Sequence, residues 1–227
     1  MWIVLPIKNL EQAKQRLASE LTPGERRELF LTMLRDVLTA LVQVRGLDGI
    51  LLVSRDPAAR ALSEEFDTAL IDEPANIGQS EAVQRGVDWI MARGGKGVVT
   101  IPGDAPLITA AEVEDLLSVN STGDRALTLS PSHDRRGTNC VVARPANLIN
   151  FHFGHQSFQP HLAEAEKAGM TARIRPLPGI GLDIDTPEDV LKFLDVDAPE
   201  TGTRRFLEQT GIADRLRQLK SNLGEGA

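Results

Sequence analysis

Short apolar runs alternate along the chain with longer segments in which apolar residues recur every three or four positions. This alternation is typical of βαβ units, which build a mostly parallel sheet with helices packed against it. The predicted strands are 2–5, 49–53, 68–71, 97–101, 126–130, 140–143, 171–177 and 182–184. The predicted helices are 22–44, 56–65, 80–93, 109–117, 158–169, 187–194 and 203–219, and capping boxes are predicted at the starts of two of them, Thr22 to Glu25 and Thr109 to Glu112. We therefore expect an α/β fold with a mixed, mostly parallel sheet flanked by helices.

The bulk properties fit a soluble globular protein. The 227 residues suit one α/β domain, which we place at 1–220, followed by a frayed tail at 221–227. The net charge of −7 argues against partners such as nucleic acid or an anionic membrane, because both require a basic surface. No apolar stretch reaches the length of a membrane span, and the N-terminus has no basic leader, so we expect a cytoplasmic protein.

Two acidic segments far apart in the sequence carry the most informative chemistry. Asp104 follows one predicted strand in the segment 101–107, and Asp183 and Asp185 lie at the end of another in 182–189. In open α/β sheets ligands bind beyond the carboxyl ends of strands, so these carboxylates are well placed to meet one. Asp183 and Asp185 are two residues apart and point to the same face of an extended chain. Such hard oxygen ligands suit Mg²⁺, which combines one or two carboxylates with water and substrate phosphates.

Each acidic segment also has a purely structural interpretation. Pro102-Gly103-Asp104 is ordinary turn chemistry, and Thr186 followed by Pro187 is a good helix start. Taken together with a basic loop near the N-terminus, however, the two segments favour a site for a metal ion and phosphate groups.

The basic loop follows the first predicted strand and contains Lys8, Lys14 and Arg16. Phosphoryl transfer needs fixed positive charge as a bond to phosphorus breaks, so these cations are candidates for holding a triphosphate. The alternative is a solvated basic turn. The chain contains neither a Gly-x-Gly-x-x-Gly motif nor a Walker-type Gly-Lys-Ser/Thr motif, which argues against dinucleotide binding and P-loop NTPase activity.

Three further polar loops contain candidate ligand-binding residues. Gly78 and Ser80 open a predicted helix whose amides could meet a ligand, although Ser80 could instead be a simple N-cap. The segment 135–139 combines two arginines, a flexible glycine and the hydroxyl of Thr138. The segment 151–157 ends at a predicted helix N-terminus, which could bind a small phosphate or carboxylate.

The remaining metal-binding and nucleophilic side chains favour structural roles. His152, His155 and His161 are grouped in the sequence, but they lack the accompanying thiolates or paired carboxylates of a zinc site. Cys140 is the single cysteine and begins an apolar run, so we expect a buried strand thiol and not a nucleophile.

In their order along the chain, these motifs resemble those of the CofC/FbiD family, the guanylyltransferases of coenzyme F-420 biosynthesis. The resemblance covers most of the sequence. The matching segments are 6–8 with 13–17, 101–107, 137–139, Phe153-Gly154-x-x-Ser157 and 182–189. One departure is Ser80, which stands where the family usually has Asn, so nucleotide recognition at this position stays open.

The resemblance implies a nucleotidyltransferase fold related to GT-A glycosyltransferases. It implies that Mg²⁺ is bound by Asp104, Asp183 and Asp185. It implies that the phosphorylated acid is bound by Thr138, Gly154 and Ser157. The nucleotide-binding residues would be Pro6, Lys8, Lys14, Arg16, Gly78, Ser80, Pro102 and Gly103, of which Lys8 and Lys14, together with Asp104, would be catalytic.

The implied reaction condenses GTP with a phosphorylated three-carbon acid to a diphosphate-linked GMP adduct and pyrophosphate. The acid would be 2-phospho-L-lactate, phosphoenolpyruvate or 3-phospho-D-glycerate, and the sequence does not choose among them or fix the preference for GTP. The family also suggests a homodimer and handoff of the product to a downstream transferase. Two alternatives stay open: another GT-A-like enzyme, such as a molybdopterin or sugar nucleotidyltransferase, and a catalytically silent nucleotide-binding regulator.

Overall fold

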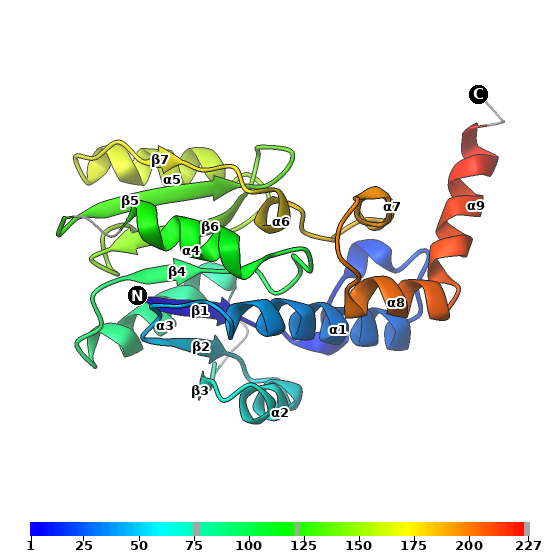
Figure 1. The fold of residues 1–227 in the computed structure, drawn as a ribbon, viewed down its shortest axis with the longest axis horizontal. Helices are drawn as coiled ribbons and strands as arrows, with labels where there is room; N and C mark the ends of the chain where they lie inside the picture. The colour runs from blue at the N-terminus through cyan, green and yellow to red at the C-terminus, as the bar shows by residue number, and fades with distance from the viewer. Residues whose placement is uncertain (75–77, 121–122, 225–227) are drawn as a thin grey trace.

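The computed structural model describes residues 1–74, 78–120 and 123–224, and within them seven strands form one sheet in the order β3-β2-β1-β4-β6-β5-β7. Figure 1 shows this sheet with helices packed on both faces. The strands are β1 Trp2–Pro6, β2 Gly49–Val53, β3 Ala69–Ile71, β4 Val98–Thr100, β5 Ala126–Pro131, β6 Thr138–Arg144 and β7 Arg173–Ile174. The helices are α1 Pro23–Leu41, α2 Pro57–Glu65, α3 Gln79–Met91, α4 Ala110–Val119, α5 Phe158–Lys167, α6 Pro178–Gly181, α7 Pro187–Asp195, α8 Gly202–Gln209 and α9 Ile212–Gly224.

The strand directions confirm the expected mixed, mostly parallel sheet. β1 runs parallel to β2 and β4, β2 runs parallel to β3, and β5 runs parallel to β7. β6 is the antiparallel member, paired with β4 on one side and β5 on the other. As a result, the carboxyl ends of β1 and β4 lie side by side, and the loops that follow them open at the same edge of the sheet.

The sheet divides the core into two apolar clusters. Ile3 and Leu5 of β1 pack in the cluster that includes α1, whereas Val4 between them packs in the cluster that includes α3. This is the alternation that a strand buried on both faces requires. Helix α3 approaches β1 closely at Gly86, where a Cβ atom would lie 2.8 Å from Val4 Cγ1.

Three helices begin with a capping box, in which a Thr hydroxyl and an acidic side chain three residues later bind each other's backbone N–H groups. The predicted boxes Thr22–Glu25 at α1 and Thr109–Glu112 at α4 are confirmed. The box at α7 joins Thr186 to Asp189 and fixes the chain directly after Asp185. Each box satisfies donors that would otherwise have no partner at the helix start.

The predicted strand at 182–184 is wrong. Leu182 and Ile184 are buried while Asp183 and Asp185 are half-buried, so the segment has the burial pattern of a strand without belonging to a ladder. It follows the short helix α6, and the backbone N of Ile184 donates to the carbonyl of Asp104 over 3.0 Å. The predicted strand at 171–177 shortens in the same region to the two residues of β7.

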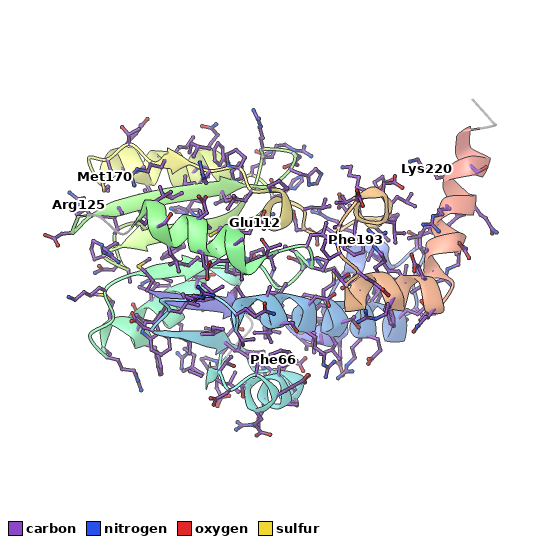
Figure 2. All side chains as sticks on the ribbon, in the orientation of Figure 1. Phe66, Glu112, Arg125, Met170, Phe193 and Lys220 are labelled. Carbon is purple, nitrogen blue, oxygen red and sulfur yellow. The ribbon has the colours of Figure 1, made fainter. Side chains whose placement is uncertain are left out.

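The short helix α6 is held against α4 by a partly buried acceptor, Glu112. Glu112 Oε1 accepts a hydrogen bond from the backbone N of Gly179 over 2.7 Å, and Figure 2 shows Glu112 on α4 next to α6. Because α6 directly precedes Asp183, this contact helps to fix the second acidic segment in place.

The predicted helix at 203–219 is two helices. Gly211 separates α8 from α9 and adopts a φ of +72°, which ends α8 in a left-handed conformation that glycine accepts without strain. Asp36 of α1 accepts hydrogen bonds from the backbone N of Gly202 and of Thr203, at 2.8 and 2.7 Å, and so fixes α8 on α1. Helix α9 then projects away from the sheet as far as Gly224 (Figure 1).

The structure can be compared with two further expectations, one about Cys140 and one about membrane-spanning segments. Cys140 is fully buried in β6, as predicted, and burial raises the pKa of its thiol far above the usual value. Among the helices in the described part of the chain, none has both the length and the apolar character needed to cross a bilayer.

Glu164 of α5 anchors the loop that precedes this helix. Its Oε2 accepts from the side-chain amide of Asn150 at 2.8 Å, and its Oε1 lies 2.6 Å from Lys167 Nζ and 3.4 Å from His152 Nε2. The bond from Lys167 and those from Asn150 and His152 outweigh the opposing effect of burial and lower the pKa of Glu164 to about 2. The carboxylate is thus a charged, buried acceptor that ties the loop to the helix.

We expect Glu164→Gln to lower the free energy of unfolding at pH 7 by about 1–3 kcal/mol, because the neutral amide loses charged hydrogen bonds. The folded pKa lies below the unfolded value of 4.5, so this stabilisation is present above pH 4.5 and is lost as the pH falls towards 2. Urea unfolding of wild type and variant between pH 7 and pH 3 should therefore give curves that converge. Glu166→Gln, an exposed substitution on the same helix, is the control. Parallel pH dependences would contradict this role.

Candidate active site

A cleft of about 610 Å³ opens at the carboxyl edge of the parallel strands. It brings together most of the predicted site residues. Those that line it are Pro6, Lys8, Arg16, Pro102, Gly103, Asp104, Thr138, Gly154, Asp183 and Asp185. Lys14 lines an adjoining cavity of about 240 Å³ that shares Lys8, Asp104 and Asp185 with the cleft. Of the predicted residues within the described ranges, Gly78, Ser80 and Ser157 lie outside the lining of both cavities.

Lys14 forms buried ion pairs with two of the carboxylates of the site, Asp104 and Asp185. Its Nζ lies 2.5 Å from Asp104 Oδ2 and 2.9 Å from Asp185 Oδ1, and 4% of its side chain is exposed. Burial alone would lower the pKa of Lys14, but the negative charges of Asp104 and Asp185 raise it above its usual value. Lys14 also has a φ of +54°, a conformation that non-glycine residues rarely adopt.

Asp183 has a different environment from Asp185. Asn139 Nδ2 donates to Asp183 Oδ1 over 3.0 Å, but in the described part of the chain no lysine or arginine forms an ion pair with Asp183. Burial, together with the negative charge of Asp104, raises the pKa of Asp183 to about 6. The charge of Lys14 instead lowers the pKa of Asp185. Asp183 therefore lacks the cationic partner that Asp185 has within the described residues.

The donor set of the cleft suits Mg²⁺ chemically. Asp104, Asp183 and Asp185 offer only carboxylate oxygens, which are the ligands that this ion prefers. Within the described residues, no group of three or more His, Cys, Asp or Glu side chains is arranged as a preformed metal site, and Lys14 contacts one oxygen each of Asp104 and Asp185. A magnesium ion that keeps water and phosphate ligands needs only one or two of these carboxylates, so the residues present fit the ion together with a nucleotide.

The other two predicted cations lie at the mouth of the cleft. Lys8 is exposed, and Arg16 Nη1 lies 3.8 Å from Asp185 Oδ2 with 56% of its side chain exposed. Both side chains can therefore move to meet an anionic ligand at little cost, unlike Lys14. The basic loop thus supplies one fixed cation and two mobile ones.

The residues predicted to bind the acid are far from the basic loop in the sequence. They belong to β6 and to the loop before α5. The backbone N of Thr138 donates to Ser157 Oγ over 2.8 Å, and both residues are buried. Ser157 is the N-cap residue of α5, but its hydroxyl makes no capping hydrogen bond. Gly154 has a φ of +150°, which a residue with a Cβ atom adopts only under strain. The structure therefore joins Thr138 and Ser157 directly, with Gly154 in the connecting loop.

The interpretation of Ser80 as an N-cap is wrong. The N-cap of α3 is Gly78, with a φ of +124°, and Ser80 lies within the first turn. Ser80 Oγ instead accepts from the backbone N of Phe153 over 2.8 Å, so it connects α3 to the acid-binding loop. Asn76 and Ile77, which precede Gly78 in the proposed motif, lie outside the described residues.

Several cleft residues were missed by the sequence interpretation. They include Phe30, Gln79, His133 and Lys192. Asn139, which also lines the cleft, belongs to the predicted segment 135–139, although no role of its own was assigned to it there. Phe30 had no usable signal, since its spacing is that of the core face of α1, and Lys192 has the pattern of an exposed helix position beside Asp189. These positions become visible only when α1 and α7 are placed around the cleft.

Comparison with known proteins identifies relatives over nearly the whole chain. The family model described as guanylyl transferase CofC like matches residues 1–222. A phosphoenolpyruvate guanylyltransferase of Conexibacter woesei is 37% identical over 210 residues, covering 91% of this chain and 94% of that protein. A 2-phospho-L-lactate guanylyltransferase of Methanocaldococcus fervens is 32% identical over 212 residues, covering 93% and 92%.

Solved structures share the fold at low sequence identity. A protein of Desulfovibrio desulfuricans, assigned to the nucleotide-diphospho-sugar transferases, has a TM-score of 0.77 and 15% identity, with 96% of each chain covered. A cytidylyltransferase of Leptospira borgpetersenii has a TM-score of 0.57 and 13% identity, with 98% of this chain and 95% of that chain covered. The expected nucleotidyltransferase fold is thereby confirmed. Because the family model spans almost every residue, the chain belongs to the CofC-like guanylyl transferase family.

Proposed function

We propose that the protein transfers GMP from GTP to the phosphate of a phosphorylated three-carbon acid, with release of pyrophosphate, as a step of coenzyme F-420 biosynthesis. The supporting observation is a cleft in a member of the guanylyl transferase family that is lined by residues of the basic loop, three carboxylates and Thr138, whose backbone N is bonded to the buried Ser157 hydroxyl. The curated relatives are named for phosphoenolpyruvate and 2-phospho-L-lactate, and 3-phospho-D-glycerate is the third candidate acceptor.

The reaction needs no nucleophile from the protein. An oxygen of the acid's phosphate attacks the α-phosphorus of GTP and forms a new P–O bond. The bond from the α-phosphorus to the bridging oxygen breaks, and pyrophosphate leaves with that electron pair. Catalysis therefore consists of alignment and neutralisation of charge. The buried thiol of Cys140 takes no part in this scheme.

The basic loop is proposed to bind the triphosphate. Lys8 and Arg16 are exposed and border the cleft, so they can neutralise the departing pyrophosphate, while Lys14 supplies a fixed charge beside Asp104. Pro6, Pro102 and Gly103 also line the cleft. Gly103 is also required for packing, because a Cβ atom there would lie 2.6 Å from Leu34 Cδ2.

We propose that Asp104, Asp183 and Asp185 hold Mg²⁺ together with the nucleotide. When bound, the ion would polarise the α-phosphoryl group and offset its negative charge. The raised pKa of Asp183 supports this proposal, because a bound cation would stabilise the charged form of this buried carboxylate. Asn139 would keep Asp183 oriented towards the ion through its 3.0 Å hydrogen bond.

The alternatives differ in their support. A molybdopterin or sugar nucleotidyltransferase usually carries a glycine-rich loop after the first strand, where this chain has Pro6-Ile7-Lys8, and the family match favours guanylyl transfer. A silent regulator would bind GTP without turnover. A cytoplasmic location, a homodimer and handoff of a labile adduct to a downstream transferase are further parts of the proposal, supported by the family resemblance.

The direct test incubates the protein with GTP, Mg²⁺ and each of the three acids separately, and identifies products by mass. We expect one acid to give a diphosphate-linked GMP adduct with equimolar pyrophosphate, because the loop proposed to bind the triphosphate and Thr138, proposed to bind the acid, line the same cleft. ATP and CTP in place of GTP measure nucleotide preference. Binding of GTP without pyrophosphate release with every acid would reject transfer and support the silent regulator.

Asp104→Asn should reduce pyrophosphate release by at least about 100-fold, because it removes a carboxylate from both the proposed ion and Lys14. The variant should also bind Mn²⁺, used as a paramagnetic probe for Mg²⁺, more weakly in the presence of a non-hydrolysable GTP analogue. Thermal melting should stay near wild type. Asp197→Asn, at an exposed position, is the control. Wild-type turnover or unchanged Mn²⁺ affinity would refute the metal assignment.

Lys14→Met should lower both activity and stability, because Asp104 and Asp185 lose their shared cation and then repel each other. We expect unfolding to become easier by about 3–5 kcal/mol, the usual result when one partner of a buried ion pair is removed. Millimolar Mg²⁺ should restore part of this stability if the ion occupies the same carboxylates. Thermal melts with and without Mg²⁺ measure the effect, and the exposed Lys96→Met is the matched control. A Lys14 variant that melts like wild type would contradict the buried role.

A further inference from the structure

His161 is a fully buried imidazole directly behind the acid-binding side of the cleft. It lies one turn along α5 from Ser157, whose carbonyl accepts from its backbone N over 3.1 Å. Its ring makes two hydrogen bonds: Nδ1 lies 3.0 Å from Thr138 Oγ1, and Nε2 accepts from the backbone N of His152 over 3.0 Å. The ring also meets Phe153 edge to face, with centroids 5.1 Å apart.

These contacts determine which ring nitrogen carries the proton. A backbone N–H can only donate, so the amide of His152 requires a lone pair on His161 Nε2. Burial and the neighbouring charge of His152, which oppose protonation, lower the pKa of His161 to about 4, so the ring is neutral at pH 7. A neutral imidazole with a lone pair on Nε2 carries its hydrogen on Nδ1. His161 Nδ1–H therefore donates to Thr138 Oγ1.

This direction has a consequence for the hydroxyl of Thr138. Because Oγ1 accepts from His161, the hydroxyl hydrogen is not needed for that contact and is free to be donated elsewhere. Thr138 lines the cleft, so this hydrogen could be donated to an anionic ligand bound there. Ser157 is arranged in the same way, since its Oγ accepts from the backbone N of Thr138 and keeps its own hydrogen. Donors supplied by the protein thus leave both hydroxyls to act as donors.

We propose that His161 is a positioning residue that holds the Thr138 hydroxyl as a hydrogen-bond donor towards the anionic group of the acceptor acid. This inference rests on the proposed function. It assigns His161 no contact with the substrate and no proton transfer. Because His161 is a fixed, neutral donor to Thr138 Oγ1, the Thr138 hydroxyl can itself donate to a carboxylate or phosphate. This second hydrogen bond strengthens recognition, because a hydrogen bond to a charged group is worth more than one between neutral groups.

A purely structural role for His161 makes different predictions. If the ring only filled space beside Phe153, its protonated nitrogen would be immaterial, and substitutions would change stability without regard to the acid. If it orients Thr138, the loss should appear in recognition of the acid and should depend on the presence of the Thr138 hydroxyl. These differences can be measured separately.

The first measurement is the tautomer of His161 in the wild-type protein. Two-dimensional ¹⁵N spectra that correlate ring nitrogens with ring hydrogens, recorded at pH 7.5, distinguish the two neutral forms from the charged one. His161→Asn identifies the signal among the four histidines. We expect a protonated Nδ1 and an unprotonated Nε2. A protonated Nε2, or a charged ring at this pH, would overturn the inference without reference to activity.

The second measurement compares variants with and without a donor at the place of Nδ1. His161→Asn keeps an amide nitrogen close to that position, whereas His161→Gln does not. We expect His161→Gln to raise the KM for the acid by about 10-fold to 100-fold, the range for a lost hydrogen bond to a charged group, with the KM for GTP unchanged. His161→Asn should stay within about threefold of wild type. Equal increases in both KM values would overturn the inference.

A double-mutant cycle separates this role from general damage to the fold. Thr138→Val removes the hydroxyl and keeps the shape, so His161→Gln should add no further increase in the acid KM in that background. Full additivity would overturn the inference. Thermal melts report whether each variant is folded. If a variant does not fold, the tautomer measurement on the wild-type protein still tests the inference. If wild type forms no adduct with any acid, the proposed function fails; if it does and His161→Gln keeps its acid KM, only this inference fails.

Discussion

The balance of charge around Lys14 is the constraint on which the active-site region depends. Three carboxylates share one cleft, and Lys14 is the buried cation between two of them. Burial of a carboxylate without a cationic partner disfavours its charged form. Asp183 is in this position, and burial together with the negative charge of Asp104 raises its pKa to about 6. The proposed binding of a cation in the cleft would favour the charged form of Asp183 again.

The fold is arranged to bring these charges together from distant parts of the sequence. The parallel pairing of β1 with β4 places the basic loop and Asp104 at one edge of the sheet. The second acidic segment is added without a strand of its own, through the bond from Ile184 N to the carbonyl of Asp104. The α7 capping box then fixes the chain after Asp185, and Glu112 fixes α6 before Asp183. A few individual hydrogen bonds thus take the place of a ladder of hydrogen bonds between strands.

Whether a feature could be predicted depends on how far apart in the sequence its interacting residues lie. Buried strands and capped helices are local patterns, so β2, α2 and the boxes at Thr22 and Thr109 matched their predictions. Alternating burial at 182–185 was mistaken for strand pairing, because periodicity records burial and not the partner. The hydroxyl of Ser80 has its partner 73 residues away, and Lys14 has its two at 90 and 171 residues. No local pattern can indicate contacts over such separations.

In the proposed reaction, the two sides of the cleft would recognise anions by different physical means. The nucleotide side would use full charges, some fixed and some mobile, which attract any polyphosphate and are weakened by salt. The acid side would use neutral hydroxyls whose direction is set by their own donors, Ser157 by the amide of Thr138 and Thr138 by His161. Oriented neutral donors would confer geometry and add no charge to a site proposed to bind several ions. Because the three candidate acids share a phosphate and a carboxylate, neither side distinguishes among them by charge. Selection among these acids must therefore come from the shape of the cleft around the middle carbon.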